Sequence, residues 1–339
     1  MGERVTGEAV VPVTAGRDAS PYQAPWWLPG GNAQTVWAAL VARRRGVVLE
    51  RSRWDSPDGD FVLVDELPGP AHAPLVVLFH GLEGGADSHY AGTLMSALAR
   101  RGWRGAIPHF RGCGGEANRL PRAYHSGDAD EIEWILERFR RGGGGRPLYV
   151  AGVSLGGNAL LKWLANRGAS AREVVHAAVA VSAPLDLAAG ADALERGFGR
   201  FYAWMFLRTM KRKVAEKAVL HPQAFDLARV RAARTIREFD DLVTAPLHGF
   251  GDAADYYARA SAKPVLRDIR VPTLVLNALN DPFLPARYLP GPGEVSAHVC
   301  LEYPETGGHV GFVNGPFPGR YDWLPRRILD FFLYTESPP

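Results

Sequence analysis

Ser154 lies at the centre of the stretch Gly152-Val153-Ser154-Leu155-Gly156. An apolar run, 147–151, precedes it, and a pattern with helical spacing, 158–164, follows it. A strand, a Gly-x-Ser-x-Gly turn and a helix in that order make a nucleophile elbow, in which a sharp turn exposes the serine hydroxyl. Small residues are needed two positions before and after the serine because the strand and helix backbones pass very close together. The sequence therefore predicts a nucleophilic serine.

Two later residues complete the set that an activated serine needs. On the fold that carries this elbow, the acid and then the histidine follow the serine along the chain. Asp281 follows the strand-like run 272–277, and His309 follows the next such run, 297–302. The histidine takes the proton from the serine hydroxyl, and the carboxylate orients the imidazole and stabilises its charged form. We predict a catalytic triad of Ser154, Asp281 and His309.

Other residues compete for these roles. Ser154 is also compatible with a simple helix cap, and Asp281 with a turn residue before a proline. The competing acids lie in a block without strands, and the competing histidines do not follow the last strand; these residues are Asp240, Asp241, Asp252, His125 and His248.

Backbone N–H groups must stabilise the oxyanion that forms when a serine attacks a carbonyl. The strand-like run 75–79 is followed by His80-Gly81-Leu82-Glu83-Gly84-Gly85, where this fold places its first oxyanion loop. The second donor comes from the residue after the nucleophile. We therefore expect an oxyanion hole made by the amides of Leu82 and Leu155.

Strand-like and helix-like runs alternate through most of the chain, which predicts a parallel sheet with helices on both faces. The alternation stops between about 185 and 260, where the pattern is mostly helical. We expect an α/β-hydrolase fold with about eight strands in a mostly parallel sheet. Its parts are an N-terminal extension packing on the core at 1–55, a core at 56–184 and 261–339, and a helical cap insertion at 185–260.

The composition is that of an ordinary globular protein. Of the 339 residues, 47% are hydrophobic and 22% are charged, and the net charge of +3 does not indicate a nucleic-acid partner. Two cysteines are too few for a disulfide framework, which favours a reducing compartment. The sequence shows no secretory signal and no uncharged apolar run of about 18 residues. We expect a cytoplasmic protein without a transmembrane segment.

The sequence indicates neither a metal nor a cofactor. It contains no His-Glu-x-x-His and no paired Cys-x-x-Cys motif. The glycine run 142–145 precedes a strand, whereas a phosphate-binding loop follows one.

Two further segments are informative. Near the expected site, we predict an ion pair between Arg111 and Asp128, with a substrate carboxylate as the alternative partner of Arg111, and a packing role for Cys113. The stretch 198–210 is rich in aromatic residues and is followed by basic ones. It is compatible with a cap helix packed on the core, with a helix lining an acyl pocket, or with peripheral contact to a membrane.

Several sequence blocks together resemble one family. They are His80-Gly81-Leu82-Glu83-Gly84, Phe110-Arg111-Gly112-Cys113-Gly114-Gly115, Tyr124-His125-Ser126-Gly127-Asp128, Gly152 to Asn158 with Leu161-Lys162-Trp163, Glu238-Phe239-Asp240-Asp241, Thr244-Ala245-Pro246 with Gly249-Phe250, and Gly307-Gly308-His309-Val310-Gly311-Phe312. From about Trp26 to Phe332, the chain resembles the YheT-like α/β-hydrolases of bacteria, plants and animals. Animal members carry an N-terminal membrane anchor, for which this sequence shows no counterpart. Where members often have His-Leu-Gln-Thr, this chain has Asn32-Ala33-Gln34-Thr35.

The resemblance implies a serine hydrolase that acts on carboxylic esters, with lipid esters hydrolysed by some eukaryotic members. Its triad falls on Ser154, Asp281 and His309. We expect Ser154 to form an acyl-enzyme with a small-molecule ester or an acyl lipid. An acyltransferase on the same fold and a non-catalytic ligand-binding protein are the alternatives.

Overall fold

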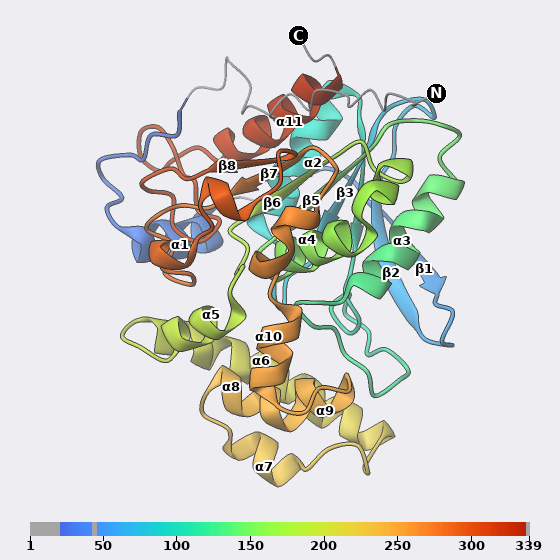
Figure 1. Cartoon of the computed structure of the whole chain (residues 1–339), viewed down its shortest axis with the longest axis vertical. Coiled ribbons are helices and arrows are strands. Elements are labelled where there is room, and N and C mark those ends of the chain that lie inside the picture. Colours follow the sequence, from blue (N-terminus) through green and yellow to red (C-terminus); the bar gives the residue numbers. More distant parts are fainter. Residues whose placement is uncertain (1–20, 43–45, 337–339) are drawn as a thin grey trace, which may run out of the picture.

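The computed structural model describes residues 21–42 and 46–336. Eight strands form one sheet in the order β1-β2-β4-β3-β5-β6-β7-β8, in which β2 is antiparallel to both neighbours and the other pairs are parallel (Figure 1). The strands are β1 Glu50–Asp55, β2 Phe61–Leu67, β3 Leu75–Phe79, β4 Arg104–Pro108, β5 Leu148–Val153, β6 Ala177–Val181, β7 Thr273–Leu276 and β8 Val299–Glu302.

Helices cover both faces of this sheet. Successive residues of a strand point to opposite faces, and β3 shows the result: Leu75, Val77 and Phe79 pack in one cluster, and Val76 and Leu78 in another. The first cluster contains α3 Ala129–Arg141 and α4 Leu155–Arg167, and the second contains α2 His89–Arg101 and α11 Trp323–Glu336. A strand that is buried on both faces has a continuous apolar sequence, as β3 has.

The predicted fold class is confirmed, including the mostly parallel sheet of eight strands. The sequence does not predict β1, because its residues, Glu-Arg-Ser-Arg-Trp-Asp, are mostly charged. Among the described strands, β1 pairs only with β2, at the edge of the sheet, and four of its six residues are exposed. Of the predicted N-terminal extension, residues 1–20 lie outside the described residues, and α1 Gly31–Val41 lies beside the segments that follow β7 and β8 (Figure 1).

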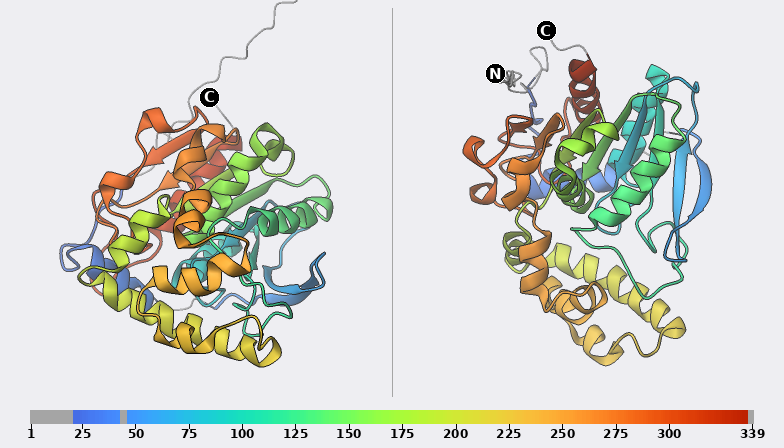
Figure 2. Two further views of the ribbon diagram at one scale, coloured as in Figure 1. Left: turned by 60° about the horizontal axis from the view of Figure 1, so that its bottom comes forward. Right: turned by 45° about the vertical axis from the view of Figure 1, so that its right-hand side comes forward.

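A block of helices between β6 and β7 lies beyond one edge of the sheet, as Figures 1 and 2 show. Its elements are α5 Leu187–Leu194, α6 Gly199–Leu220, α7 Leu227–Ala232, α8 Ile236–Phe239, the π-helical turn η2 Asp240–Thr244, α9 Ala245–Leu247 and α10 Ala253–Ala260. Short 3₁₀ helices lie elsewhere, at η1 Gly168–Glu173, η3 Lys263–Asp268, η4 Ala286–Tyr288 and η5 Pro292–Glu294. Within the described part of the chain, none of the helices has the length and apolarity to cross a bilayer.

The turn between β5 and α4 is strained and very tightly packed. Ser154 has φ 53°, in the left-handed region that L residues rarely occupy. A Cβ atom on Gly152 would lie 2.6 Å from the Gly156 carbonyl oxygen, and one on Gly156 would lie 2.5 Å from the carbonyl oxygens of Phe79 and His80. Both obstacles are backbone atoms, so the turn requires glycine at these two positions.

We predict that Gly156→Ala destabilises the protein by at least about 2 kcal/mol, because the added methyl group overpacks against two backbone carbonyls. Gly92→Ala, in α2, is the matched control, since a Cβ there meets nothing within 4 Å. It should stabilise the protein by about 0.5–1 kcal/mol through helix propensity. Urea unfolding measures both, and equal stability of the two variants would contradict this account of the turn.

Candidate active site

Three side chains that are distant in sequence form one hydrogen-bonded chain at the edge of the sheet. Ser154 Oγ lies 2.9 Å from His309 Nε2, and His309 Nδ1 lies 2.9 Å from Asp281 Oδ2 and 3.1 Å from Oδ1. A carboxylate only accepts hydrogen bonds, so Nδ1 carries the imidazole proton and Nε2 accepts from the serine hydroxyl. The structure thus brings the three predicted residues together, with the free ring nitrogen facing the hydroxyl.

The loop after β7 holds both Asp281 and the His309 ring. The Asp281 side chain is 1% exposed, and its Oδ1 accepts a hydrogen bond of 2.8 Å from the Phe283 amide. The Phe283 ring stacks on the imidazole, with ring centres 3.9 Å apart and planes at 14°. One loop therefore orients the imidazole through a carboxylate at its edge and an aromatic ring on its face. The sequence does not indicate this role of Phe283.

The buried side chain of His80 fixes the loop after β3 through two hydrogen bonds. Its Nδ1–H donates to the Gly81 carbonyl at 2.7 Å, and its Nε2 accepts from the Phe110 amide at 3.0 Å. Burial lowers the pKa of His80 to about 3, so the ring stays neutral at pH 7 and keeps both bonds. This histidine is thus a structural link between the loops that follow β3 and β4.

The amides on either side of Leu82 are bonded to tyrosine hydroxyls. Gly81 N–H donates to Tyr90 Oη and Glu83 N–H to Tyr124 Oη, both at 2.9 Å. A Cβ on Gly81 would lie 3.1 Å from Ser154 Cβ, so this loop passes directly against the serine. The Leu82 amide is therefore held within a fixed loop next to Ser154.

Leu155, the second predicted oxyanion donor, is the first residue of α4. The first amides of a helix have no acceptor within the helix, and the helix dipole favours negative charge there. Leu82 and Leu155 line the same cavity as Ser154. Their positions suit the oxyanion role, which stays a prediction.

The cavity at Ser154 has a volume of about 120 Å³ and a mostly apolar wall. Helices of the insertion supply much of this wall through Leu187, Leu194, Phe206, Met210 and Ile236. Only part of the aromatic stretch 198–210 therefore lines the cavity. Within that stretch, the side chains of Phe198, Phe201, Trp204 and Met205 are instead exposed, at 45–55%.

The competing acids have other partners. Asp240, in the cavity wall, accepts hydrogen bonds from Thr244 Oγ1 at 2.6 Å and Tyr257 Oη at 2.7 Å. Asp241 accepts from the Ala253 amide at 2.7 Å, and Asp252 caps α10. The competing histidines, His125 and His248, pack against each other with ring centres 4.4 Å apart.

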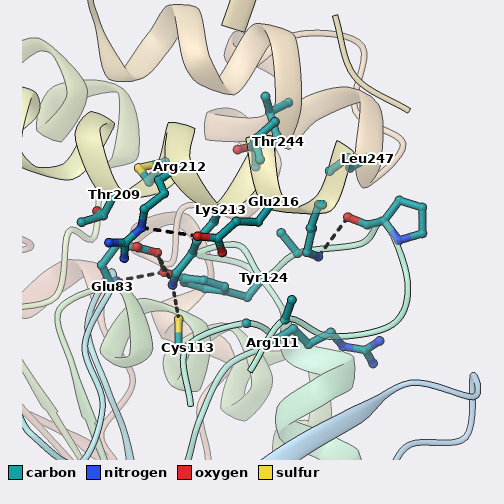
Figure 3. A pocket seen from close by; sticks show the side chains of 18 of the residues that line it. Glu83, Arg111, Cys113, Tyr124, Thr209, Arg212, Lys213, Glu216, Thr244 and Leu247 are labelled. Carbon is teal, nitrogen blue, oxygen red and sulfur yellow. Dashed lines mark hydrogen bonds and ion pairs between the residues drawn. The ribbon is translucent and has the colours of Figure 1, made fainter. Parts of the chain in front are cut away.

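A second cavity of about 380 Å³ adjoins the first and shares Leu82, Tyr124, Met210 and Thr244 with it. Figure 3 shows Lys213 of α6 reaching across it toward Glu83 and Cys113. Lys213 Nζ lies 2.8 Å from Glu83 Oε1 and 3.2 Å from Cys113 Sγ. Burial raises the pKa of the Cys113 thiol, which favours the unreactive protonated form and agrees with a packing role.

The predicted ion pair between Arg111 and Asp128 is wrong. Asp128 pairs with Arg122, at 2.6 Å. The Arg111 guanidinium is buried among three other carboxylates, those of Asp58, Asp60 and Glu131. Two of these, Asp58 and Asp60, lie in the turn between β1 and β2. The fold brings this turn to Arg111, and the sequence spacing does not reveal it.

Residues 74–316 match the family model described as "alpha/beta hydrolase fold". YheT of Escherichia coli (strain K12), a provisionally named esterase, is 42% identical over 312 residues, which cover 90% of this chain and 91% of YheT. The protein belongs to the YheT-like α/β-hydrolases. This family resemblance, expected from the sequence blocks, is therefore confirmed.

More distant relatives carry lipase-type names. Mouse phospholipase ABHD3 is 29% identical over 320 residues, covering 91% of this chain and 77% of that protein. A monoacylglycerol lipase of Saccharomyces cerevisiae is 27% identical over 276 residues, covering 79% and 60%. Among solved structures, mouse α/β-hydrolase domain-containing protein 10 has a TM-score of 0.55 at 14% identity, covering 85% of this chain and 100% of that one. That likeness shows the α/β-hydrolase fold.

We predict that the contribution of Asp240 to the stability of the protein falls as pH rises. Burial raises the pKa of this carboxyl from 3.8 to about 6. Its favourable contribution is thus fully present below about pH 4 and is lost as pH rises through about 6. This difference in pKa corresponds to about 3 kcal/mol of unfolding free energy. Relative to wild type, Asp240→Asn should gain about this much in unfolding free energy between pH 4 and pH 8, as measured by urea unfolding. A difference that stays constant with pH would contradict the prediction.

Proposed function

We propose that this α/β-hydrolase is a serine carboxylic ester hydrolase that works through an acyl-enzyme. The observation that carries the proposal is the 2.9 Å contact between Ser154 Oγ and His309 Nε2. The other ring nitrogen of His309, Nδ1, bonds the Asp281 carboxylate. His309 takes the serine proton as Ser154 Oγ attacks the ester carbonyl. The amides of Leu82 and Leu155 receive the oxyanion.

The second half of the reaction returns the enzyme to its starting state. His309 gives its proton to the leaving alkoxide, and the alcohol departs from the acyl-enzyme. Water then donates a proton to His309 and attacks the acyl carbonyl, and the returning proton restores the Ser154 hydroxyl. The products are a carboxylic acid and an alcohol.

The cavity at Ser154 supports a proposal about the substrate class. Its mostly apolar wall suits an acyl chain or an apolar alcohol part. The esterase, phospholipase and monoacylglycerol lipase names of the relatives point to the same class. We therefore infer esters with an apolar part, acyl lipids included.

We further propose that the outer face of α6 contacts a lipid surface. Phe201, Trp204 and Met205 of α6, and Phe198 directly before it, are 45–55% exposed, and the Arg208 guanidinium lies 5.8 Å from the centre of the Trp204 ring. Aromatic residues beside basic ones on an exposed helix suit the interface of an anionic membrane. The inner face of the same helix lines the cavity at Ser154, so a lipid ester would have a short path to the serine.

We predict that Ser154→Ala lowers kcat for a p-nitrophenyl ester by on the order of 10⁶, because no other group replaces the nucleophile. A fluorophosphonate probe should label the wild type at Ser154 and leave this variant unlabelled. Ser170→Ala, at an exposed serine whose hydroxyl donates to the Arg167 carbonyl, is the matched control and should keep full activity. Undiminished turnover by Ser154→Ala would refute the proposal. A product ester formed in preference to acid when alcohol is added would favour the acyltransferase alternative.

We predict that replacing both Phe201 and Trp204 by serine weakens binding to vesicles of anionic phospholipid at least about 10-fold, because the apolar contact with the interface is lost. Turnover of a water-soluble short-chain ester should be unchanged. The control replaces two exposed apolar residues at the other end of α6, Val219 and Leu220, by serine. Co-sedimentation with vesicles measures binding. Equal binding by both double variants, or no binding by wild type, would rule out this surface.

A further inference from the structure

α1 and the loop that carries His309 are far apart in sequence and in direct contact in the structure. The contact is made by Gln34 and Thr35, which precede this loop by more than 270 residues. Both residues are buried, with Gln34 1% exposed and Thr35 9% exposed. The triad uses neither of them, so their polar groups require another explanation.

Thr35 bonds the backbone of His309 itself. Its Oγ1 accepts a hydrogen bond of 2.8 Å from the His309 amide, and its hydroxyl proton goes to the Gly31 carbonyl at 2.7 Å. The hydroxyl has one proton, which the Gly31 carbonyl takes, so its lone pairs face the histidine. The Thr35 rotamer and the position of the His309 amide are thus coupled.

Gln34 joins the loops that carry the acid and the histidine. Its Oε1 accepts from the Gly307 amide at 2.8 Å and from Asn280 Nδ2 at 3.1 Å, while its Nε2 donates to the Leu28 carbonyl at 3.1 Å. Asn280 in turn accepts from the Gly308 amide at 2.9 Å. Because Asn280 precedes Asp281 and Gly308 precedes His309, this buried network ties the two loops to each other.

Glycines on both sides allow this close approach. A Cβ on Gly308 would lie 2.6 Å from the Gly31 carbonyl oxygen, and one on Gly311 would lie 2.6 Å from the Gln34 carbonyl oxygen. A Cβ on Gly31 would lie 1.9 Å from the Asn280 carbonyl oxygen. The glycines around His309 therefore serve the contact with α1 as well as the turn.

The opposite side of the loop has its own supports. His89 of α2 donates to the Val310 carbonyl at 2.9 Å, and Ser182, directly after β6, accepts from the Val310 amide at 3.1 Å. The backbone at positions 307–310 is thus hydrogen-bonded by α1 on one side and by His89 and Ser182 on the other. Without α1, the amides of Gly307 and His309 lose the acceptors that Gln34 and Thr35 provide.

We propose that Gln34 and Thr35 are positioning residues, which set the place of His309 relative to Ser154 and Asp281 through the backbone of the two loops. The inference rests on the proposed function, since it assigns a step to His309. Proton transfer needs the imidazole within hydrogen-bond reach of the hydroxyl. A displacement of about 1 Å can cost about 100-fold in rate, so loss of this support should lower kcat without changing the cavity that binds substrate.

The test compares Thr35→Val, which keeps the shape of the side chain and removes the hydroxyl, with Thr35→Ser, which keeps the hydroxyl. For a soluble p-nitrophenyl ester, Thr35→Val should lower kcat by about 10- to 100-fold with KM within about twofold of wild type. Thr35→Ser should restore kcat to within about threefold of wild type. Gln34→Met, of similar length and without the amide, should show the same loss of kcat.

The control is Thr273→Val, at the start of β7. Thr273 is fully buried and donates to the Val271 carbonyl at 2.9 Å, so its loss costs stability away from the site. It should lower the melting temperature and leave kcat unchanged. A merely structural role of Thr35 would give this same pattern in Thr35→Val and would overturn the inference. If Thr35→Val does not fold, the Gln34→Met and Thr35→Ser results decide.

Labelling by a fluorophosphonate separates the two levels of the proposal. If wild type is labelled at Ser154 and Thr35→Val is labelled at the same rate, the positioning role fails and the proposed function stands. If wild type is neither labelled nor able to turn over esters, the proposed function itself fails. Slow labelling of folded Thr35→Val, with recovery in Thr35→Ser, supports both.

Discussion

The hydrogen bond between Ser154 and His309 depends on the positions of the strands, turns and loops around it. It forms because β5, β7 and β8 are parallel, so their carboxyl ends reach the same edge of the sheet. It also requires Ser154 in a left-handed conformation that the surrounding packing must hold. The crowded glycines of the elbow and the bonded loop after β3 meet that requirement. The strained backbone at Ser154 therefore persists because the residues around it are rigidly packed.

The helical insertion is joined to the core close to this point. Lys213 pairs with Glu83, which adjoins Leu82, and Lys217 donates to the carbonyls of Leu120 and Pro121. Burial lowers the pKa of Lys217 to about 8, so it is mostly charged at neutral pH and keeps these bonds. α6 is thus fixed to the loops after β3 and β4, while its N-terminal half has an apolar face toward solvent. One helix therefore links the cavity wall, the loop of the proposed oxyanion hole and the outer surface.

Much of the fold and of the candidate site could be predicted because the signals are local. The elbow depends on residues within two positions of Ser154, and the strands show as apolar runs because both faces are buried. Where the signal was not local, prediction failed. The charged edge strand β1 has no apolar run to reveal it, and Arg111 pairs across the fold with Asp58 and Asp60 in place of Asp128.

The sequence by itself determined the order of the strands from β2 to β8, the turn at Ser154 and the positions of Asp281 and His309 after successive strands, because backbone sterics and strand periodicity act between near neighbours. Tertiary structure alone decided that Phe283 would cover the imidazole and that Gln34 and Thr35 would hold its loop. Those contacts are hydrogen bonds and ring packing between segments up to 274 residues apart. No spacing along the chain records them, because they exist only once the sheet has brought its strand ends together.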